Sequence, residues 1–400
     1  MNRKIVLLGF YVGDEYFDKY SKGDPYPQVA AYKLEGRFLD ALHVDGNVVT
    51  TIASIAVTTY PRNKRICFPA AKVEGAWGGG VVIPLVNFPL IKMLSRLFGS
   101  SVNLFRLRKA NVDWVCVYAA HTPNLVAAYI GAKLLGLPYF VYIPDLPVFM
   151  DMGVARGKIT RLLKKIDSWL IDIFVSGGAG VFVASKYMVT DSAKWSGKPF
   201  LVLEGIANSV AMPSVAVEAD VPKEFIFYAG GLSKAYGIVE LVEGFIKANT
   251  KFELWLCGRG ELELYLSEVS ERYPSIKYLG FLSPREVERV QATAAGLIMN
   301  RNPHERYTRY SFPSKLLEYM VSGIPILTTR LDGIPEEYFE HLNVIDDPSS
   351  EGISSALVAF GAMDRQILSK KAACARIWVL ENKTSSAVGR KIVNFMEMHK

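Results

Sequence analysis

Short runs of apolar residues alternate with helix-length segments along the whole chain. In the first half, the pattern predicts strands at residues 4–10, 114–118, 139–143 and 180–184. The segment 122–135 has the length of a crossover helix, and Gly136 and Pro138 follow it as termination signals. Nearly continuous apolar strands joined by helices are typical of parallel sheets covered on both faces. The pattern therefore predicts an α/β fold.

The same rhythm begins again after a Val-, Pro- and Ala-rich stretch at 211–222. Further strands are predicted at 225–229, 252–257, 276–279, 296–299 and 325–328. Helices are predicted between them at 237–248, 261–272, 284–292 and 314–321. We therefore predict two doubly wound, Rossmann-like domains that face each other across a cleft, since parallel sheets bind ligands at the carboxyl ends of their strands.

Composition limits the class of protein. The chain has 400 residues, of which 50% are hydrophobic, enough to bury two cores. The apolar start ends at Gly13 without a small-residue cleavage site, and no stretch reaches the roughly 18 apolar residues of a spanning helix. The 4 cysteines lie far apart without a CxxC pair, so neither a zinc site nor a disulfide framework is predicted. We expect a cytoplasmic protein.

The formal net charge of +7 points to a polyanionic partner. The basic residues are not mixed with an aromatic RNA-binding signature or a helix-turn-helix pattern, so no nucleic-acid partner is expected. An anionic membrane surface and a phosphorylated small molecule remain the two candidates for this partner.

Two glycine-rich loops follow predicted strands of the second half and precede helices, at residues 230–237 and 258–261. Glycines let backbone amides approach a phosphate closely, and a helix amino terminus favours negative charge. The alternative is a pair of ordinary tight turns. Neither loop matches GxGxxG or GxxxxGK[ST], which argues against dinucleotide binding and P-loop chemistry.

A third element, YSFPSKLLEYM at residues 310–320, predicts a helix that begins at Pro313 or Ser314. Its first amides and Lys315 are candidates for holding a diphosphate, and Glu318, one turn further on, is a candidate for a ribose diol. An ordinary helix cap with both side chains in solvent is the alternative.

These residues carry a resemblance to a known family. The segment 311–325 together with GIPEE at 333–337 resembles the donor-site signature of glycosyltransferase family 4, whose members are retaining enzymes with the GT-B fold. The resemblance extends over the second half and, less specifically, to the segment from 112 to 138. It implies domains at 1–210 for the acceptor and 211–380 for a nucleotide sugar, with 381–400 packing back on the first domain.

The resemblance also implies roles for single residues. His121, at the end of a predicted strand, aligns with a residue near the transferring sugar and is the predicted catalytic residue. The predicted donor-binding residues are Gly230, Gly231, Lys234, Gly258, Arg259, Gly260, Ser314, Lys315 and Glu318. Since no Asp-x-Asp motif lies after an apolar strand, we expect neither a metal nor another cofactor.

The sequence departs from the family pattern at two places. Tyr310 occupies the position of the first signature glutamate, and Gly231 and Tyr236 occupy those of the usual diphosphate-binding Arg and Lys. Lys234 and Lys315 are the available substitutes. The sequence therefore does not identify the residues that contact the donor sugar.

Basic residues cluster with large apolar ones at 88–109 and 156–174, which is typical of segments that lie on an anionic membrane. Helices that merely cover the first sheet are the alternative. We expect a retaining hexosyltransferase that uses a UDP- or GDP-sugar and a lipid-linked acceptor in surface polysaccharide synthesis, peripheral at the inner face of the cell membrane. A GT-B nucleotide-sugar 2-epimerase and a catalytically silent scaffold of a polysaccharide assembly complex are the alternatives.

Overall fold

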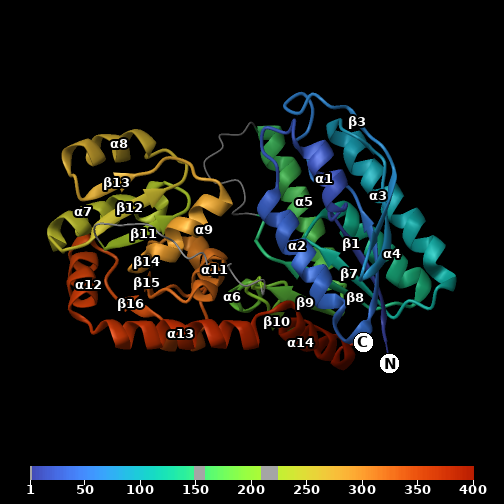
Figure 1. Cartoon of the computed structure of the whole chain (residues 1–400). Coiled ribbons are helices and arrows are strands. Elements are labelled where there is room, and N and C mark those ends of the chain that lie inside the picture. Colours follow the sequence, from blue (N-terminus) through green and yellow to red (C-terminus); the bar gives the residue numbers. More distant parts are fainter. Residues whose placement is uncertain (1, 148–157, 209–223) are drawn as a thin grey trace. The chain divides into compact units, whose positions relative to one another are not determined.

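The computed structural model describes residues 2–147, 158–208 and 224–400, and Figure 1 shows the course of the chain. These residues form two compact units: the first comprises Met1–Ile206 with Ser385–Lys400, and the second comprises Ala207–Thr384. The predicted Val-, Pro- and Ala-rich stretch at 211–222 lies outside the described residues. Each unit is built around its own sheet, mainly parallel in the first unit and wholly parallel in the second.

The described part of the first unit holds an 8-stranded sheet in which all neighbours are parallel except β4 and β5. In sheet order its strands are β10 (Phe200–Val202), β9 (Gly180–Val183), β8 (Tyr139–Ile143), β7 (Trp114–Tyr118), β1 (Lys4–Gly9), β2 (Val48–Ala53), β5 (Gly78–Val82) and β4 (Ala71–Gly75). A separate antiparallel pair joins β3 (Cys67–Phe68) and β6 (Leu85–Val86).

Helices cover both faces of this sheet because its connections run in opposite directions from β1. The chain passes from β1 to β2 through one pair of helices and from β2 back to β7, β8 and β9 through three others, and right-handed crossovers place these two sets on opposite faces. The helices are α1 (Asp14–Ser21), α2 (Val29–Leu42), α3 (Pro89–Arg106), α4 (Thr122–Leu135), α5 (Lys158–Ser176), α6 (Tyr187–Thr190) and α14 (Ser385–Met398).

The carboxyl-terminal helix α14 packs on α2 and completes the first core. Its Val388, Ile392 and Phe395 belong to the same buried cluster as Phe38 of α2. Gly389 allows this close packing, because a Cβ atom there would lie 2.1 Å from the carbonyl oxygen of Ala41. Residues far apart in sequence thus share one core.

The described part of the second unit holds a 6-stranded sheet that is parallel throughout. In sheet order its strands are β13 (Ile276–Tyr278), β12 (Glu253–Cys257), β11 (Phe225–Ala229), β14 (Gly296–Met299), β15 (Ile326–Thr329) and β16 (Asn343–Ile345). Its helices are α7 (Ile238–Ala248), α8 (Glu263–Arg272), α9 (Pro284–Thr293), α10 (Arg306–Arg309), α11 (Lys315–Ser322), α12 (Ser350–Ala362) and α13 (Arg365–Asn382).

These elements confirm the predicted α/β class with two Rossmann-like domains. The bounds of β7, β8, β11, β14 and α4 are those that the sequence predicts, and other ends differ by one or two residues. The apolar pattern does not predict β2, β4 and β5 or helices α1 and α2. Glycines at 78–80 and small polar residues weaken the apolar signal of these strands.

Candidate functional site

Two glycine loops pack directly on each other at the carboxyl ends of β11 and β12. The amide of Gly230 donates to the carbonyl of Cys257 at 3.1 Å, and the amide of Leu232 donates to the carbonyl of Arg259 at 2.9 Å. Gly258 has φ +144°, and a Cβ atom there would lie 1.8 Å from the carbonyl oxygen of Gly230. Both loops therefore keep their shape only with glycine at this contact.

This packing uses most of the loop amides that the sequence predicts to face a phosphate. The amide of Gly258 donates to the carbonyl of Gly280 at 2.9 Å, and that of Gly260 donates to Glu263 at 2.9 Å. Within the described residues, the amide of Gly231 has no acceptor. The tight-turn alternative thus accounts for Gly230, Gly258 and Gly260, and Gly231 is the loop glycine that offers a donor.

Helix α11 lies against the same strand ends. The backbone amide of Ala229, the last residue of β11, donates to the Tyr319 hydroxyl at 3.1 Å. Burial raises the pKa of the Cys257 thiol to about 11, and the nearby positive charge of Lys315 acts in the opposite direction. The positive charge at the amino-terminal turn of α11 therefore acts on the end of β12 as well.

The predicted polar residues of α11 pair with each other. Lys315 Nζ lies 2.9 Å from Glu318 Oε2, with side-chain exposures of 35% and 49%. The helix begins at Lys315, one residue later than predicted, with Ser314 as the preceding exposed residue. A half-exposed ion pair of this kind stabilises little by itself, so both groups are available to a ligand.

Three further cations surround the loops. Lys234 is exposed, and its backbone amide donates to Glu261 at 2.9 Å. The Arg259 guanidinium lies 4.3 Å from the centroid of the exposed Phe281 ring. Arg301, which the sequence analysis missed, follows β14, and its guanidinium lies 5.0 Å from the centroid of the Tyr236 ring.

Arg301 is notable because Tyr236 occupies a position where the resembling family has a cation. No motif marks Arg301, although its place just beyond a strand's carboxyl end was visible in the sequence. The second unit thus gathers Gly231, Lys234, Lys315, Glu318 and Arg301 near one edge of its sheet.

In the first unit, His121 lies between the carboxyl end of β7 and the amino terminus of α4. Its ring meets the Phe10 ring edge-on with centroids 5.1 Å apart. Its Nδ1 atom is buried and has no hydrogen-bond partner among the described residues.

Arg96 of α3 holds the other ring nitrogen of His121. Its Nη1 lies 3.2 Å from His121 Nε2, while Nε donates to Ser54 Oγ at 3.0 Å and Nη2 donates to the Ile55 carbonyl at 2.8 Å. Because a guanidinium only donates, Nε2 is the acceptor and the ring proton is on Nδ1. His121 therefore presents an N–H donor that no neighbour uses.

The surroundings keep His121 neutral. Burial lowers its pKa well below the ordinary histidine value, and the charges of Arg96 and Lys92 lower it further. Burial and the neighbouring Arg96 lower the pKa of Lys92 to about 7, and burial lowers that of Arg96 to about 10.

This geometry corrects one detail of the sequence interpretation. The pattern at 88–109 places Lys92 and Arg96 among the bases expected to face a membrane, but both side chains are buried, with residue exposures of 6%. Lys92 Nζ donates to the Val57 carbonyl at 2.5 Å and to Thr59 Oγ1 at 3.1 Å. These two cations face the sheet and not the outer surface.

A buried carboxyl group fixes the loop after β1. Glu35 accepts hydrogen bonds from the amides of Phe10 at 2.8 Å and Tyr11 at 3.0 Å. Burial raises the pKa of Glu35 to about 8, although both amide bonds act in the opposite direction. Phe10 is thereby held against His121 and Arg96, whose Cζ lies 5.1 Å from the Phe10 centroid.

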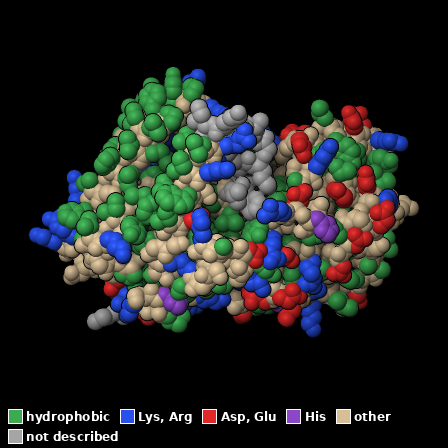
Figure 2. All heavy atoms as spheres, turned by 180° about the vertical axis from the view of Figure 1, so that it is seen from behind, with side chains coloured by type: hydrophobic (Ala, Val, Ile, Leu, Met, Phe, Trp, Pro, Cys, Tyr) green, Lys and Arg blue, Asp and Glu red, His purple; other side chains and the backbone are tan. Residues whose placement is uncertain are grey.

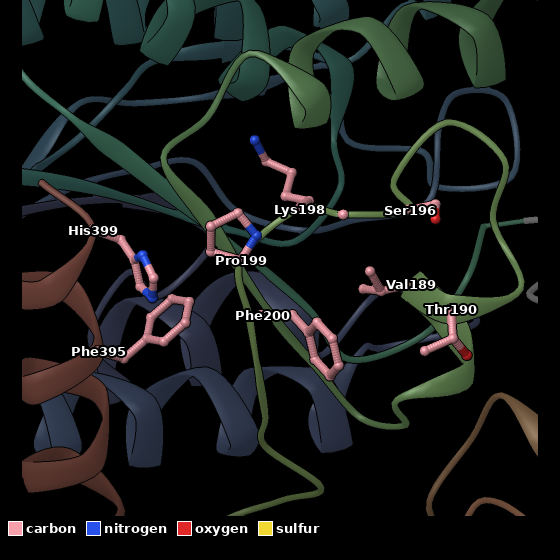
Figure 3. Close-up of a pocket in the computed structure, with 9 residues that line it drawn as sticks. Val189, Thr190, Ser196, Lys198, Pro199, Phe200, Phe395 and His399 are labelled. Carbon is pink, nitrogen blue, oxygen red and sulfur yellow. The ribbon is translucent and has the colours of Figure 1, made fainter.

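A shallow pocket of about 500 Å³ lies elsewhere in the first unit and contains none of the predicted site residues. Figure 3 shows Phe395 and His399 of the carboxyl-terminal segment beside Pro199 and Phe200. The amine of Lys198 is turned away from this pocket and donates to the carbonyls of Ser176 and Gly178.

The described residues contain no cluster of three or more His, Cys, Asp or Glu side chains that is suited to a metal ion. In the same ranges, no helix is both long and apolar enough to cross a membrane.

Comparison with known proteins finds a family model that matches most of the second unit. Residues 223–360 match the family model described as "Glycosyl transferases group 1". This part of the chain resembles a group 1 glycosyl transferase domain. The domain contains both glycine loops, Arg301 and helix α11. No curated protein matches the sequence.

Solved structures resemble the chain over nearly its whole length. A glycosyltransferase from Rickettsia africae has a TM-score of 0.65 at 13% identity over 100% of both chains. The lipopolysaccharide outer core galactosyltransferase WaaB has 0.57 at 14% over 99% of both. Anabaena HepE in complex with UDP-glucose has 0.58 at 14%, also over 99% of both. At this identity the likeness shows the fold, which is the predicted GT-B fold.

Replacing Arg96 by Met should raise the pKa of His121. The substitution removes a positive charge that disfavours the imidazolium and the donor that occupies Nε2, while the larger effect of burial remains. An NMR titration of the ring resonances, assigned with a His121→Gln variant, measures the shift.

Arg96→Lys is the matched control, because it keeps a positive charge and should shift the pKa less. An unchanged His121 pKa in a folded Arg96→Met protein would contradict the assigned contact.

Proposed function

We propose that the chain is a glycosyltransferase that takes a sugar from a UDP-sugar donor and transfers it, with retention of anomeric configuration, to a lipid-linked acceptor. The observation that carries this proposal is the meeting of the glycine loops and the amino terminus of α11, with Lys315 and Glu318, inside the group 1 domain. HepE, which has the same fold, is described in complex with UDP and with UDP-glucose, which favours UDP. The structural neighbours are named as transferases and synthases, so the epimerase and scaffold alternatives are not favoured.

We infer that donor binding breaks the Lys315–Glu318 ion pair and replaces it with contacts from each of the two side chains to the donor. A diphosphate attracts Lys315, Lys234 and Arg301 and the open amide of Gly231, and Glu318 is then released to accept from the ribose hydroxyls. The pair is partly exposed, so breaking it costs little. This arrangement supplies positive charge although Gly231 and Tyr236 stand where the family has cations.

In the proposed reaction, the bond between the anomeric carbon and the diphosphate oxygen breaks while an acceptor oxygen bonds to the same carbon. The acceptor oxygen attacks on the face from which the diphosphate leaves, so retention needs no protein nucleophile, and the acceptor proton passes to the leaving diphosphate. Cations around the diphosphate stabilise the developing negative charge. We assign His121 the role of a neutral hydrogen-bond donor, through Nδ1, to the transferring sugar.

We further propose that the outer surface of α3, α4 and α5 binds an anionic membrane. Helix α3 has the reverse of ordinary amphipathicity: it buries Lys92, Arg96 and Ser100, each four residues apart. Its exposed side instead carries a stripe of large apolar residues, namely Leu90, Leu94, Phe98, Val102 and Phe105. Apolar surface of this extent is rare on a surface that faces only water.

The neighbouring helices extend this surface, since α4 contacts both α3 and α5. Leu134 of α4 is 68% exposed and Trp169 of α5 is 55% exposed. Figure 2 shows hydrophobic side chains gathered over the first unit, at the left of the view, with Lys and Arg at the margin. Apolar groups bordered by cations match the interface of an anionic bilayer.

UDP should raise the melting temperature of the wild-type protein, and Glu318→Ala should reduce this stabilisation by weakening UDP binding. Loss of charge-assisted hydrogen bonds to the ribose costs about 1.5–3 kcal/mol, or roughly 10- to 150-fold in Kd. A thermal-shift titration with UDP, GDP and their sugar derivatives measures the effect.

Glu351→Ala removes another ion-paired carboxylate of the same unit, the partner of Lys247, and should leave UDP binding unchanged. Equal UDP affinity in Glu318→Ala and wild type would exclude Glu318 from the site.

His121→Ala should lower kcat by about a hundredfold or more and change the KM for the donor little, because its contact is with the transferring sugar and develops at the transition state. Steady-state kinetics with a UDP-sugar and an acceptor extract measure both constants. Wild-type turnover in the folded variant would remove His121 from the mechanism.

Replacing Arg108, Lys109, Arg161 and Lys165 by glutamine should weaken sedimentation with phosphatidylglycerol vesicles. Each base near an anionic surface contributes about 1 kcal/mol, so the loss is at most about 4 kcal/mol and shrinks with added salt. All four side chains are exposed.

A control variant with Lys64, Lys72, Arg285 and Lys370 replaced has the same net charge and should bind vesicles like wild type. If wild-type protein ignores these vesicles at low salt, the apolar surface does not bind membranes, and a soluble acceptor replaces the lipid-linked one.

A further inference from the structure

A groove of about 420 Å³ lies between α3 and α4, within the apolar surface. Its lining is made almost wholly of apolar side chains and consists of Ser101, Val102, Phe105, Arg106, Ala127, Ile130, Gly131, Leu134 and Leu135. This volume is typical of pockets that hold small ligands. The groove is open to the outside, and Val102, Ile130 and Leu134 on its walls are themselves exposed.

The floor of the groove depends on a close approach of the two helices. Leu104 of α3 is buried against Gly131 of α4, where a Cβ atom would lie 2.3 Å from Leu104 Cδ2. Ser100 Oγ also donates to Asn124 Oδ1 at 3.1 Å, so the two helices are joined along their length. The groove is thus a fixed feature of the packing of α3 on α4.

Charge at the groove is of one sign. The segments 88–112 and 114–144, which include all of α3 and α4, contain no Asp or Glu. Arg106 lines the groove, and Arg108, Lys109 and Lys133 are exposed on the same two segments. An apolar slot whose end carries several cations is complementary to a hydrocarbon chain that bears an anionic head group.

We propose that this groove binds one acyl chain of an anionic bilayer lipid, with the head group held by Arg106 and its basic neighbours. The inference deepens the proposed membrane association: the bilayer contributes a bound lipid in addition to a surface. The class of ligand is a single-chain or diacyl phospholipid with net negative charge.

The position of the groove identifies this lipid as an anchor and not as the sugar acceptor. Gly131 lies ten residues beyond His121 along α4, which is about 15 Å along the helix axis at 1.5 Å per residue. Arg106 lies ten residues beyond Arg96, the partner of His121, along α3. A head group at Arg106 is therefore remote from the residue proposed to contact the transferring sugar.

The test uses lauroyl lysophosphatidylglycerol as a probe, at concentrations below micelle formation, and measures its binding to the full chain by calorimetry. Wild-type protein should bind it with 1:1 stoichiometry. Val102→Trp and Ile130→Trp fill the groove from exposed positions and should weaken binding at least tenfold. Leu94→Trp places the same ring on the apolar stripe outside the groove and should bind like wild type.

Arg106→Gln should reduce the preference for lysophosphatidylglycerol over the zwitterionic lysophosphatidylcholine. No binding of the monomeric probe by wild-type protein, or equal binding by the groove-filled variants, would overturn the proposal.

Sedimentation with phosphatidylglycerol vesicles and the UDP thermal shift, measured on the same samples, separate the possible failures. Vesicle binding without probe binding rejects the groove alone. Loss of both rejects the membrane association as well, and absence of a UDP shift rejects the proposed donor site independently.

Discussion

Parallel strand pairing is the constraint on which both groups of candidate site residues depend. When all strands of a sheet point the same way, every loop that leaves a carboxyl end emerges at the same edge. In the second unit this brings the loops after β11, β12 and β14 together, and in the first it brings Phe10, Ser54 and His121 together after β1, β2 and β7. Residues from distant parts of the chain become neighbours without any local signal between them.

The two sides of helix α3 lie in different environments: the inner side faces the sheet and the outer side is exposed. Its inner side carries Lys92 and Arg96 because the loops after β2 offer hydroxyl and carbonyl acceptors that compensate the buried charges. With polar groups on the inside, the apolar residues of the helix are on the outside. The surface assigned to the membrane and the charges that add to the effect of burial in keeping His121 neutral therefore lie on opposite faces of one helix.

The sequence predicted those features that local signals specify. The predicted bounds of α4 were correct, and Gly136 and Pro138 mark its end. Strands β7 and β8 were predicted correctly because they are fully apolar. Strands β5 and β4, at one side of the first sheet, were missed because β5 is rich in glycine and β4 is largely exposed. Helix periodicity alone does not say which side of a helix faces inward.

Among the candidate site residues, too, the sequence showed the local motifs but not the contacts between distant segments. The glycine loops were visible as motifs, but the use of their amides was not, because the amide of Gly230 donates to the carbonyl of Cys257 and that of Gly258 donates to the carbonyl of Gly280, both in other segments of the chain. Arg96 was read as a surface base, since a buried and an exposed arginine have the same sequence. Arg301 carries no motif at all, and only the sheet order reveals that it lies near Tyr236.

The place of α14 in the first core has a consequence for biosynthesis. Val388, Ile392 and Phe395 complete that core, yet the ribosome makes them only after the whole of the second unit. At about 5–20 residues per second, the roughly 180 intervening residues delay this helix by about 10–35 s. During that interval the nascent first unit exposes the apolar surface of α2 that α14 later covers. The second unit, whose described core residues are contiguous in sequence, is able to fold before the first is finished.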